Sequence, residues 1–424
     1  MTAFAANGRA YRAPERRTLA VCIDGTALEY LDDALAHGVM PSLRAALERG
    51  GRLLEARAQV PTLTNVNNAS IVTGVSAAVH GIGGNHYLAP DGTERQLTAA
   101  AALRAETILA AAQRAGIPAL AVTAKDKLRD LLGAGGVPSI SAEKAHEQTL
   151  DGLDGATGTD VAGANPGIYD PLLSAYALDL ALALAERMGA ALVYCSLTDY
   201  VQHKAAPGSE LARAWCAALD ERLGRALTEG WVVGMVADHG MNDKTRPGGA
   251  PDVRYLADAL AAAGVTGATV VLPITDPYVV HHGALGSAAY VHLADPTADG
   301  ARARGALAAL DGVEAVLDRG AAALVFELPA DRIGDLVVLA DRRTVLGKSE
   351  AEHDLAAVGD TLRSHGGLHE QAVPLILTEP VPGAFADRRD LRNADLFDLL
   401  LNGVPAAAAA DHDRRATAAT AGPA

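Results

Sequence analysis

The sequence predicts an α/β fold in which a mostly parallel sheet lies between two layers of helices, with an α+β domain inserted into the chain. Two observations predict it. Short apolar runs that lead to an acidic residue alternate with helical patterns, which is typical of parallel sheets covered on both faces. Between residues 247 and 361 this pattern gives way to short strand-like runs and Ala-rich stretches.

The first core strand is predicted at residues 18–23, where a short apolar run ends at Asp24. A helix is predicted at residues 41–48, because Pro41 is favoured in the first turn of a helix and Gly50 lies just past its end. The rest of the core repeats these two kinds of element. Further strands are predicted at 118–122, 191–196, 232–237 and 373–377, and further helices at 65–72, 106–115, 172–187, 210–227 and 393–401.

The change of pattern divides the chain into a core at residues 18–246 and 362–404 and an inserted cap domain at residues 247–361. Within the cap, strands are predicted at 268–272, 288–293 and 336–339, and helices at 253–262 and 301–310. Residues 152–167 are rich in Gly, Asp and Thr and are predicted to form a long surface loop. The low-complexity tail at residues 405–424 is predicted to be disordered.

Composition excludes several classes of function. The 424 residues include 36 Lys and Arg against 51 Asp and Glu, a formal net charge of -15, whereas nucleic acids and anionic membranes require a basic surface. The three cysteines show no CxxC spacing, and the N-terminal segment lacks the apolar run of a secretory signal. We therefore expect a cytoplasmic protein with no nucleic-acid or membrane partner.

Carboxylates and imidazoles accumulate where predicted strands end. The candidate metal ligands are Asp24, Asp199, His203, Asp238, His239 and His365, with Thr64 as a seventh. The carboxyl ends of parallel strands meet at one edge of a sheet, so most of these side chains are expected to lie close together. Singly, Asp24 could cap a turn and His365 could be a surface histidine. Together, mixed oxygen and nitrogen ligands favour zinc over manganese or iron.

Thr64 precedes the helix predicted at residues 65–72, which places it at the N-cap. A structural N-cap is the ordinary interpretation of a threonine there. The free N–H groups of a helix N-terminus can also bind a phosphoryl group, and a hydroxyl beside a metal can act as a nucleophile. Residue preference at helix N-termini alone favours a structural N-cap over a nucleophile at Thr64.

Residues 61–85 resemble the nucleophile segment of the nucleotide pyrophosphatase/phosphodiesterase branch of the alkaline phosphatase superfamily. The run TNVNNASIVTG, followed by VHGIGGN, is most similar to the phosphonoacetate hydrolases. Further similar runs lie at residues 21–25, 196–203, 237–241 and 364–371, so the resemblance extends from about residue 7 to residue 401. It implies an alkaline-phosphatase-like core.

The resemblance also implies a ligand set and a reaction. One zinc ion is expected on Asp199, His203 and His365, and a second on Asp24, Asp238, His239 and Thr64. Spacing alone does not separate His365 from His369, but the His-Gly-Gly form of the family favours His365. The implied reaction cleaves the carbon–phosphorus bond of phosphonoacetate, giving acetate and phosphate through a phosphothreonine at Thr64. Asn85 is expected to donate to a phosphonyl oxygen.

Lys125 and Lys127 follow the strand predicted at 118–122 and so lie at the same sheet edge. A Lys-Asp-Lys triplet is ordinarily a solvated loop. Their place and the resemblance favour binding of the substrate carboxylate instead.

Two other functions stay open: a P–O phosphodiesterase or phosphomonoesterase of the same superfamily, and a non-catalytic metal-binding module, which Thr64 disfavours. The sequence leaves the assembly state open, with a homodimer as one candidate.

Overall fold

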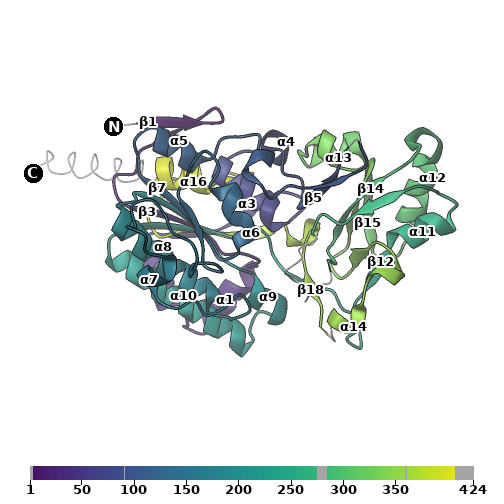
Figure 1. Ribbon diagram of the computed structural model, residues 1–424. Helices are drawn as coiled ribbons and strands as arrows, with labels where there is room; N and C mark the ends of the chain where they lie inside the picture. Colours follow the sequence, from purple (N-terminus) through teal and green to yellow (C-terminus); the bar gives the residue numbers. More distant parts are fainter. Residues whose placement is uncertain (1–2, 90, 275–283, 359–360, 406–424) are drawn as a thin grey trace, which may run out of the picture.

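The computed structural model describes residues 3–89, 91–274, 284–358 and 361–405, so the predicted disordered tail lies outside the described residues from position 406 onward. Figure 1 shows two lobes, a larger one built on a seven-stranded sheet and a smaller one built on a four-stranded sheet. In the part of the chain that is described, no helix combines the length and the apolarity needed to cross a membrane.

The larger sheet has a mixed topology that is mostly parallel. Its strand order is β4 (Arg52–Arg57), β19 (Ala372–Leu377), β10 (Val232–Val236), β3 (Thr18–Cys22), β9 (Leu192–Ser196), β7 (Ala119–Thr123) and β8 (Ser139–Ser141). Neighbours from β10 to β8 pair in parallel, whereas β19 is antiparallel to both β10 and β4. This confirms the predicted fold class. The edge strand β4 was not predicted from the sequence.

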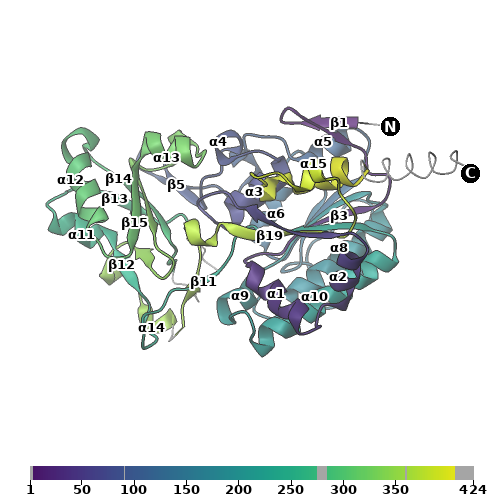
Figure 2. The same ribbon diagram turned by 180° about the vertical axis from the view of Figure 1, so that it is seen from behind.

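Helices cover both faces of this sheet, which explains why every residue of β3, β7, β9 and β10 is buried. One layer contains α1 (Leu28–Ala36), α2 (Pro41–Glu48), α8 (Leu173–Met188) and α10 (Glu210–Thr228) (Figure 2). The other contains α3 (Thr64–Thr73), α5 (Ile108–Arg114), α6 (Asp126–Leu132) and α16 (Leu396–Asp398), of which α16 is labelled in Figure 1. The three cysteines are free and buried.

The smaller lobe has its own antiparallel sheet and apolar core. Its strands follow the order β13 (Thr269–Val271), β14 (Ala288–His292), β16 (Leu336–Ala340) and β15 (Val313–Asp318). Helices α11 (Leu256–Ala262) and α12 (Pro296–Ala308) contribute Leu260 and Leu307 to a core that includes Val291 and Val338. The boundaries of the inserted domain, residues 247–361, stay a prediction.

Two helices of the smaller lobe begin elsewhere than predicted. Only the later part of the segment predicted as a helix at 253–262 is helical. Its first residues, Val253–Tyr255, form β12, which pairs in parallel with β17 (Val345–Gly347), and α11 begins after them. Short apolar runs do not distinguish strand from helix without a partner. The helix predicted at 301–310 begins instead at Pro296, because the Asp295 side chain accepts the N–H groups of Thr297 and Ala298.

Two segments of the larger lobe also differ from expectation. The loop predicted at 152–167 contains the short helix α7 (Gly158–Ala162), which begins with a capping box of Thr157 and Asp160. The closing helix predicted at 393–401 consists of a 3₁₀ turn (Asn393–Asp395), α16 and a π-helical turn (Leu399–Gly403). Both differences concern local hydrogen bonding, which hydrophobic periodicity does not specify.

Candidate active site

The site lies at the carboxyl ends of four neighbouring parallel strands. Asp238, Asp24, Asp199 and Lys125 follow β10, β3, β9 and β7, which are adjacent in this order in the sheet. Because parallel strands end at the same edge, residues more than 200 positions apart converge there. The aspartates are at most 4% exposed.

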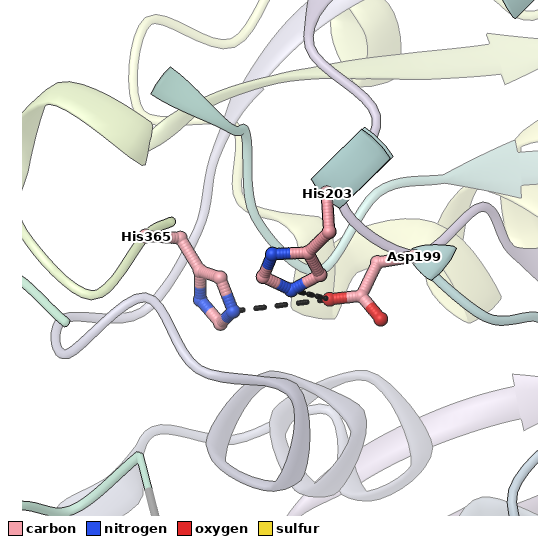
Figure 3. Close-up of side chains that lie close together, drawn as sticks. All are labelled: Asp199, His203 and His365. Carbon is pink, nitrogen blue, oxygen red and sulfur yellow. Dashed lines mark ion pairs between the residues drawn. The ribbon is translucent and has the colours of Figure 1, made fainter. Parts of the chain in front are cut away.

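The first candidate metal group consists of Asp199, His203 and His365, whose ligand atoms lie within 4.8 Å of one another (Figure 3). Asp199 precedes the short helix α9 (Tyr200–Lys204), and His203 lies one turn further along it. Asp199 Oδ2 is 2.9 Å from His203 Nε2 and 3.8 Å from His365 Nε2. The carboxylate oxygen therefore faces both imidazoles.

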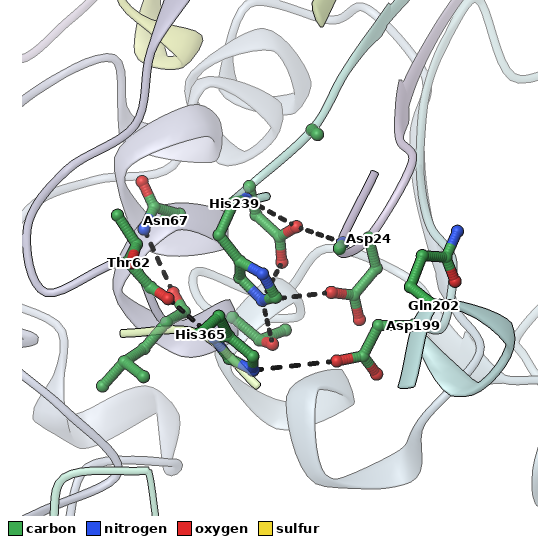
Figure 4. A network of polar contacts seen from close by, with 12 residues as sticks. Asp24, Thr62, Asn67, Asp199, Gln202, His239 and His365 are labelled. Carbon is green, nitrogen blue, oxygen red and sulfur yellow. Dashed lines mark hydrogen bonds and ion pairs between the residues drawn. The ribbon is translucent and has the colours of Figure 1, made fainter. Parts of the chain in front are cut away.

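The second candidate metal group consists of Asp24, Asp238 and His239, all fully buried. Figure 4 shows Asp24 and His239 of this group next to Asp199 and His365 of the first. His239 Nε2 is 3.4 Å from Asp24 Oδ1 and 3.7 Å from Asp238 Oδ2. The rings of His239 and His365 stack with their centroids 3.6 Å apart, so the two groups are adjacent.

All three histidines of these groups use the same ring nitrogen to contact the backbone. Nδ1 lies 2.7 Å from the Arg363 carbonyl oxygen in His203, 2.7 Å from that of Thr62 in His365 and 2.9 Å from that of Gly240 in His239. A carbonyl oxygen accepts hydrogen bonds but cannot donate them, so Nδ1 carries a hydrogen in each case, and Nε2 is the ring nitrogen directed at the site. Backbone carbonyls orient metal-binding histidines in this way.

Like the orientation of the histidines, the state of the buried carboxylates shows whether cations fit this site. Asp24 Oδ1 is buried and accepts no hydrogen bond from the described residues. Burial, together with the neighbouring Asp199 and Asp238, raises the pKa of Asp24 well above its usual range, and burial raises the pKa of Asp238 to about 6. Divalent cations would offset this repulsion. The donor set of carboxylates and imidazoles therefore fits zinc at both groups.

Lys125 lies between the two groups. Its ammonium is 3.1 Å from Asp24 Oδ2 and 2.5 Å from Asp199 Oδ1. Burial would raise the pKa of Asp199, but the charges of Lys125 and His203 outweigh it and hold that pKa well below its usual range. In this structure, Lys125 thus contacts the candidate metal ligands directly.

Thr64 is the first residue of α3, and Leu63 occupies the N-cap position. The prediction of an N-cap threonine was therefore wrong by one position, because the extended backbone of Leu63 begins the helix earlier. The remaining residues of α3 are buried, whereas Thr64 is partly exposed. Its Oγ1 lies 3.2 Å from His239 Nε2, so the hydroxyl faces the second metal group and caps no helix N–H.

One pocket contains the predicted nucleophile and all predicted substrate-binding residues. Thr64, Asn85, Lys125 and Lys127 line it together with the first metal group. Its remaining lining residues, which sequence reasoning missed, are Leu63, Asn65, Thr123, Leu128, Leu197 and Ile274. Asn65 could have been found as a polar neighbour of Thr64. Ile274 arrives from the segment after β13, and no local pattern indicates its place.

The two alternative histidines of the 365–369 segment lie in different surroundings. His365 belongs to the first metal group, whereas His369 Nε2 contacts Glu314 Oε2 at 2.8 Å, and the His369 side chain is 39% exposed. The geometry thus favours His365 as the candidate ligand.

Comparison with known proteins assigns the family. Residues 18–368 match the family model described as type I phosphodiesterase/nucleotide pyrophosphatase. The chain belongs to this family. The resemblance noted from the sequence is therefore confirmed at this level.

Solved structures agree with the family assignment. Crystal structures of phosphonoacetate hydrolase from Sinorhizobium meliloti 1021, in complex with phosphonoformate or with phosphonoacetate, share 40% sequence identity with a TM-score of 0.89. The alignment covers 95% of this chain and 99% of that one. Murine ectonucleotide pyrophosphatase/phosphodiesterase 5 shares 16% identity at a TM-score of 0.63, over 91% of this chain and 94% of that one, which shows the common fold.

Proposed function

We propose that this chain hydrolyses the carbon–phosphorus bond of phosphonoacetate, giving acetate and phosphate. One observation carries the proposal: a single pocket is lined by Thr64, whose hydroxyl faces the second candidate metal group, and by Lys125 and Lys127. The relative that is 40% identical was crystallised with phosphonoacetate, which supports the same substrate here.

The ligands assigned from the resemblance would hold two zinc ions. Asp199, His203 and His365 would hold one, and Asp24, Asp238, His239 and Thr64 the other. Bound zinc would offset the negative charge of the phosphonate and favour the ionised form of the Thr64 hydroxyl. The buried carboxylates and the Nε2 atoms that face them support this assignment.

Thr64 is the proposed nucleophile. Its Oγ would form a bond to phosphorus as the bond to carbon breaks, and the electron pair of that bond would pass to the departing acetate. The carboxylate delocalises this pair before carbon takes up a proton. Water would then cleave the phosphothreonine, which releases phosphate and restores the hydroxyl.

Asn85, Lys125 and Lys127 are the proposed substrate-binding residues. Asn85 is 8% exposed, and its backbone is held on both sides, because its N–H donates to the Pro273 carbonyl at 2.8 Å and its carbonyl accepts from Leu97 at 2.8 Å. A fixed backbone suits an amide that donates to a phosphonyl oxygen. The lysines would bind the substrate carboxylate, for which the Lys125 ammonium would have to exchange its contacts with Asp24 and Asp199.

The proposal is tested by phosphate release from phosphonoacetate, comparing zinc-reconstituted protein with a chelator-treated sample. We expect release that depends on zinc. If phosphonoacetate is inert and a nitrophenyl phosphate diester is hydrolysed, the chain is a P–O phosphodiesterase of the same superfamily. If neither substrate reacts although zinc binds, the protein is not the enzyme proposed.

A further inference from the structure

A buried ion pair connects the chain segments that carry His239 and His365, one histidine of each metal group. Lys244 Nζ lies 2.9 Å from Glu370 Oε1, and both side chains are 0% exposed. Neither residue lines the pocket described above. A buried pair is costly to desolvate and often replaceable by apolar residues without loss of stability, so stability alone is a weak explanation for it.

Glu370 holds the segment that follows His365. Its Oε2 accepts the N–H of Gly367 at 3.0 Å. The Gly367 carbonyl in turn accepts the Thr62 hydroxyl at 2.9 Å, and the Thr62 carbonyl accepts Nδ1–H of His365 at 2.7 Å. The carboxylate is therefore connected to the His365 ring through two intervening residues.

Glu370 also holds the segment that follows His239. Its backbone carbonyl accepts the N–H of Gly240 at 2.8 Å, and the carbonyl of Gly240 orients the His239 ring. Its Oε1 accepts the side-chain amide of Asn242 at 2.6 Å. One residue thus supports one histidine from each metal group.

Lys244 anchors this arrangement to the smaller lobe. Its ammonium donates to the Arg342 carbonyl at 2.9 Å, and Arg342 Nε donates to Asn242 Oδ1 at 2.9 Å. The strands β11 (Asn242–Asp243) and β18 (Arg363–Ser364) pair beside these contacts. The ammonium also holds the Glu370 carboxylate in place.

We propose that Glu370, paired with Lys244, is a positioning residue that fixes the two metal groups relative to each other. The inference rests on the proposed two-zinc function. The stacked rings of His239 and His365 belong to different groups, so a shift of either segment would change the separation of the two bound ions. Outer residues that orient metal ligands typically change metal affinity by about 10- to 100-fold when they are replaced.

The test compares zinc affinity with stability in Lys244→Met, Glu370→Gln and the double variant. Each single variant leaves a buried group without its partner and is expected to be less stable than wild type. The double variant removes both charges, but its amide cannot accept from Asn242 and Gly367 as a carboxylate does. We expect it to be more stable than either single variant, because no buried charge is left unpaired, while its zinc affinity, measured by chelator competition, stays about 10- to 100-fold below wild type.

A double variant that regains both stability and wild-type zinc affinity would overturn the inference, because the pair would then be structural only. If the double variant does not fold, Glu370→Asp makes the same comparison. It keeps the charge beside Lys244 but shortens the reach to Gly367, so wild-type zinc affinity in it would likewise overturn the inference.

Asp220→Asn is the matched control. Asp220 is 2% exposed and accepts the N–H groups of Ser42 and Leu43 at 2.8 Å, at the start of α2. The change should lower stability and leave zinc affinity unaltered.

Zinc stoichiometry of the wild-type protein is measured first. Failure to bind two ions contradicts the proposed function, whereas normal wild-type binding with unchanged variants contradicts only the positioning role.

Discussion

At the scale of single residues, surroundings give chemically identical side chains different properties. Asp24 and Asp199 both follow strands of one sheet and both are buried. The pKa of Asp24 is raised by burial and by the neighbouring carboxylates, whereas the pKa of Asp199 is held low by Lys125 and two histidines that outweigh burial. The residue type alone indicates neither direction.

Thr64→Ala should abolish hydrolysis of phosphonoacetate, because no other group would form the bond to phosphorus. We expect a loss in kcat of at least about 1,000-fold. Zinc content, measured by metal analysis, should stay near the wild-type value, since the remaining ligands hold each group. Thr64→Ser retains a hydroxyl and should keep part of the activity. Substantial turnover by Thr64→Ala would exclude the covalent mechanism.

The two lysines should differ in their effects. Lys127→Ala should lower kcat/KM for phosphonoacetate by about 10- to 100-fold, as expected for a charged hydrogen bond, with a smaller effect on an aryl phosphonate that lacks the carboxylate. Lys125→Ala should lower kcat/KM for both substrates and alter zinc affinity, because Lys125 contacts Asp24 and Asp199. Equal losses on both substrates in Lys127→Ala would argue against carboxylate recognition.

At the scale of elements, helix α3 and the short helix α4 (Ala77–His80) form a rigid support for the pocket. His80 is fully buried, and its Nδ1 accepts the N–H of Ile82 at 3.1 Å. Nε2 therefore carries the hydrogen and lies 2.9 Å from the Ser70 hydroxyl on α3. This contact fixes the segment that leads from α3 to Asn85.

The stability contributed by His80 should depend on pH. Burial lowers its pKa from 6.5 to about 3. Below pH 6.5 the unfolded chain binds a proton that the folded chain does not, so this stability is present above pH 6.5 and is lost as the pH falls toward 3. The contribution should decrease by about 1.4 kcal/mol per pH unit within that window.

The His80→Asn variant should lack this dependence, while its side-chain oxygen can still accept the N–H of Ile82. Urea unfolding of both proteins between pH 4 and 6, under identical zinc conditions, measures the difference between their slopes. Parallel slopes would show that His80 is protonated in the folded protein or contributes no pH dependence.

Most core elements could be predicted because their signals are local. The strand predicted at 18–23 is observed as Thr18–Cys22, and α2 begins and ends where Pro41 and the glycines indicate. The strand Arg52–Arg57 has charged ends and lies at the edge of the sheet, so it shows no buried apolar run. Its place depends on pairing with Ala372–Leu377, which is more than 300 residues away.

At the scale of the whole molecule, the two lobes meet at the site. Ile274, from the segment after β13, lines the pocket with residues of the larger sheet, and Arg342 contacts Lys244 beside the metal groups. The pocket therefore depends on how the lobes pack.

A cytoplasmic location and a homodimer stay predictions.

Zinc should stabilise the whole protein, because the buried carboxylates repel one another without cations. At a free zinc concentration 100 times the Kd, each occupied site should add about 2.7 kcal/mol to the free energy of unfolding. Thermal unfolding of chelator-treated protein before and after zinc addition checks this. Magnesium at equal concentration should have a smaller effect, since imidazole ligands suit it poorly. Equal Tm values with and without zinc would contradict metal binding at these groups.

The sequence by itself determined the α/β class, most core elements and the identity of the candidate ligands, because short apolar runs and the residues that follow them are adjacent in the chain. It left His365 and His369 equivalent by spacing. It also predicted Thr64 at the N-cap of α3, whereas Thr64 is the first residue of that helix. Only the tertiary structure brought Asp24, Asp199 and Asp238 together with three histidines whose Nε2 atoms face them. That outcome depends on strand order and, for His203 and His365, on backbone carbonyls from distant segments, which no local pattern encodes.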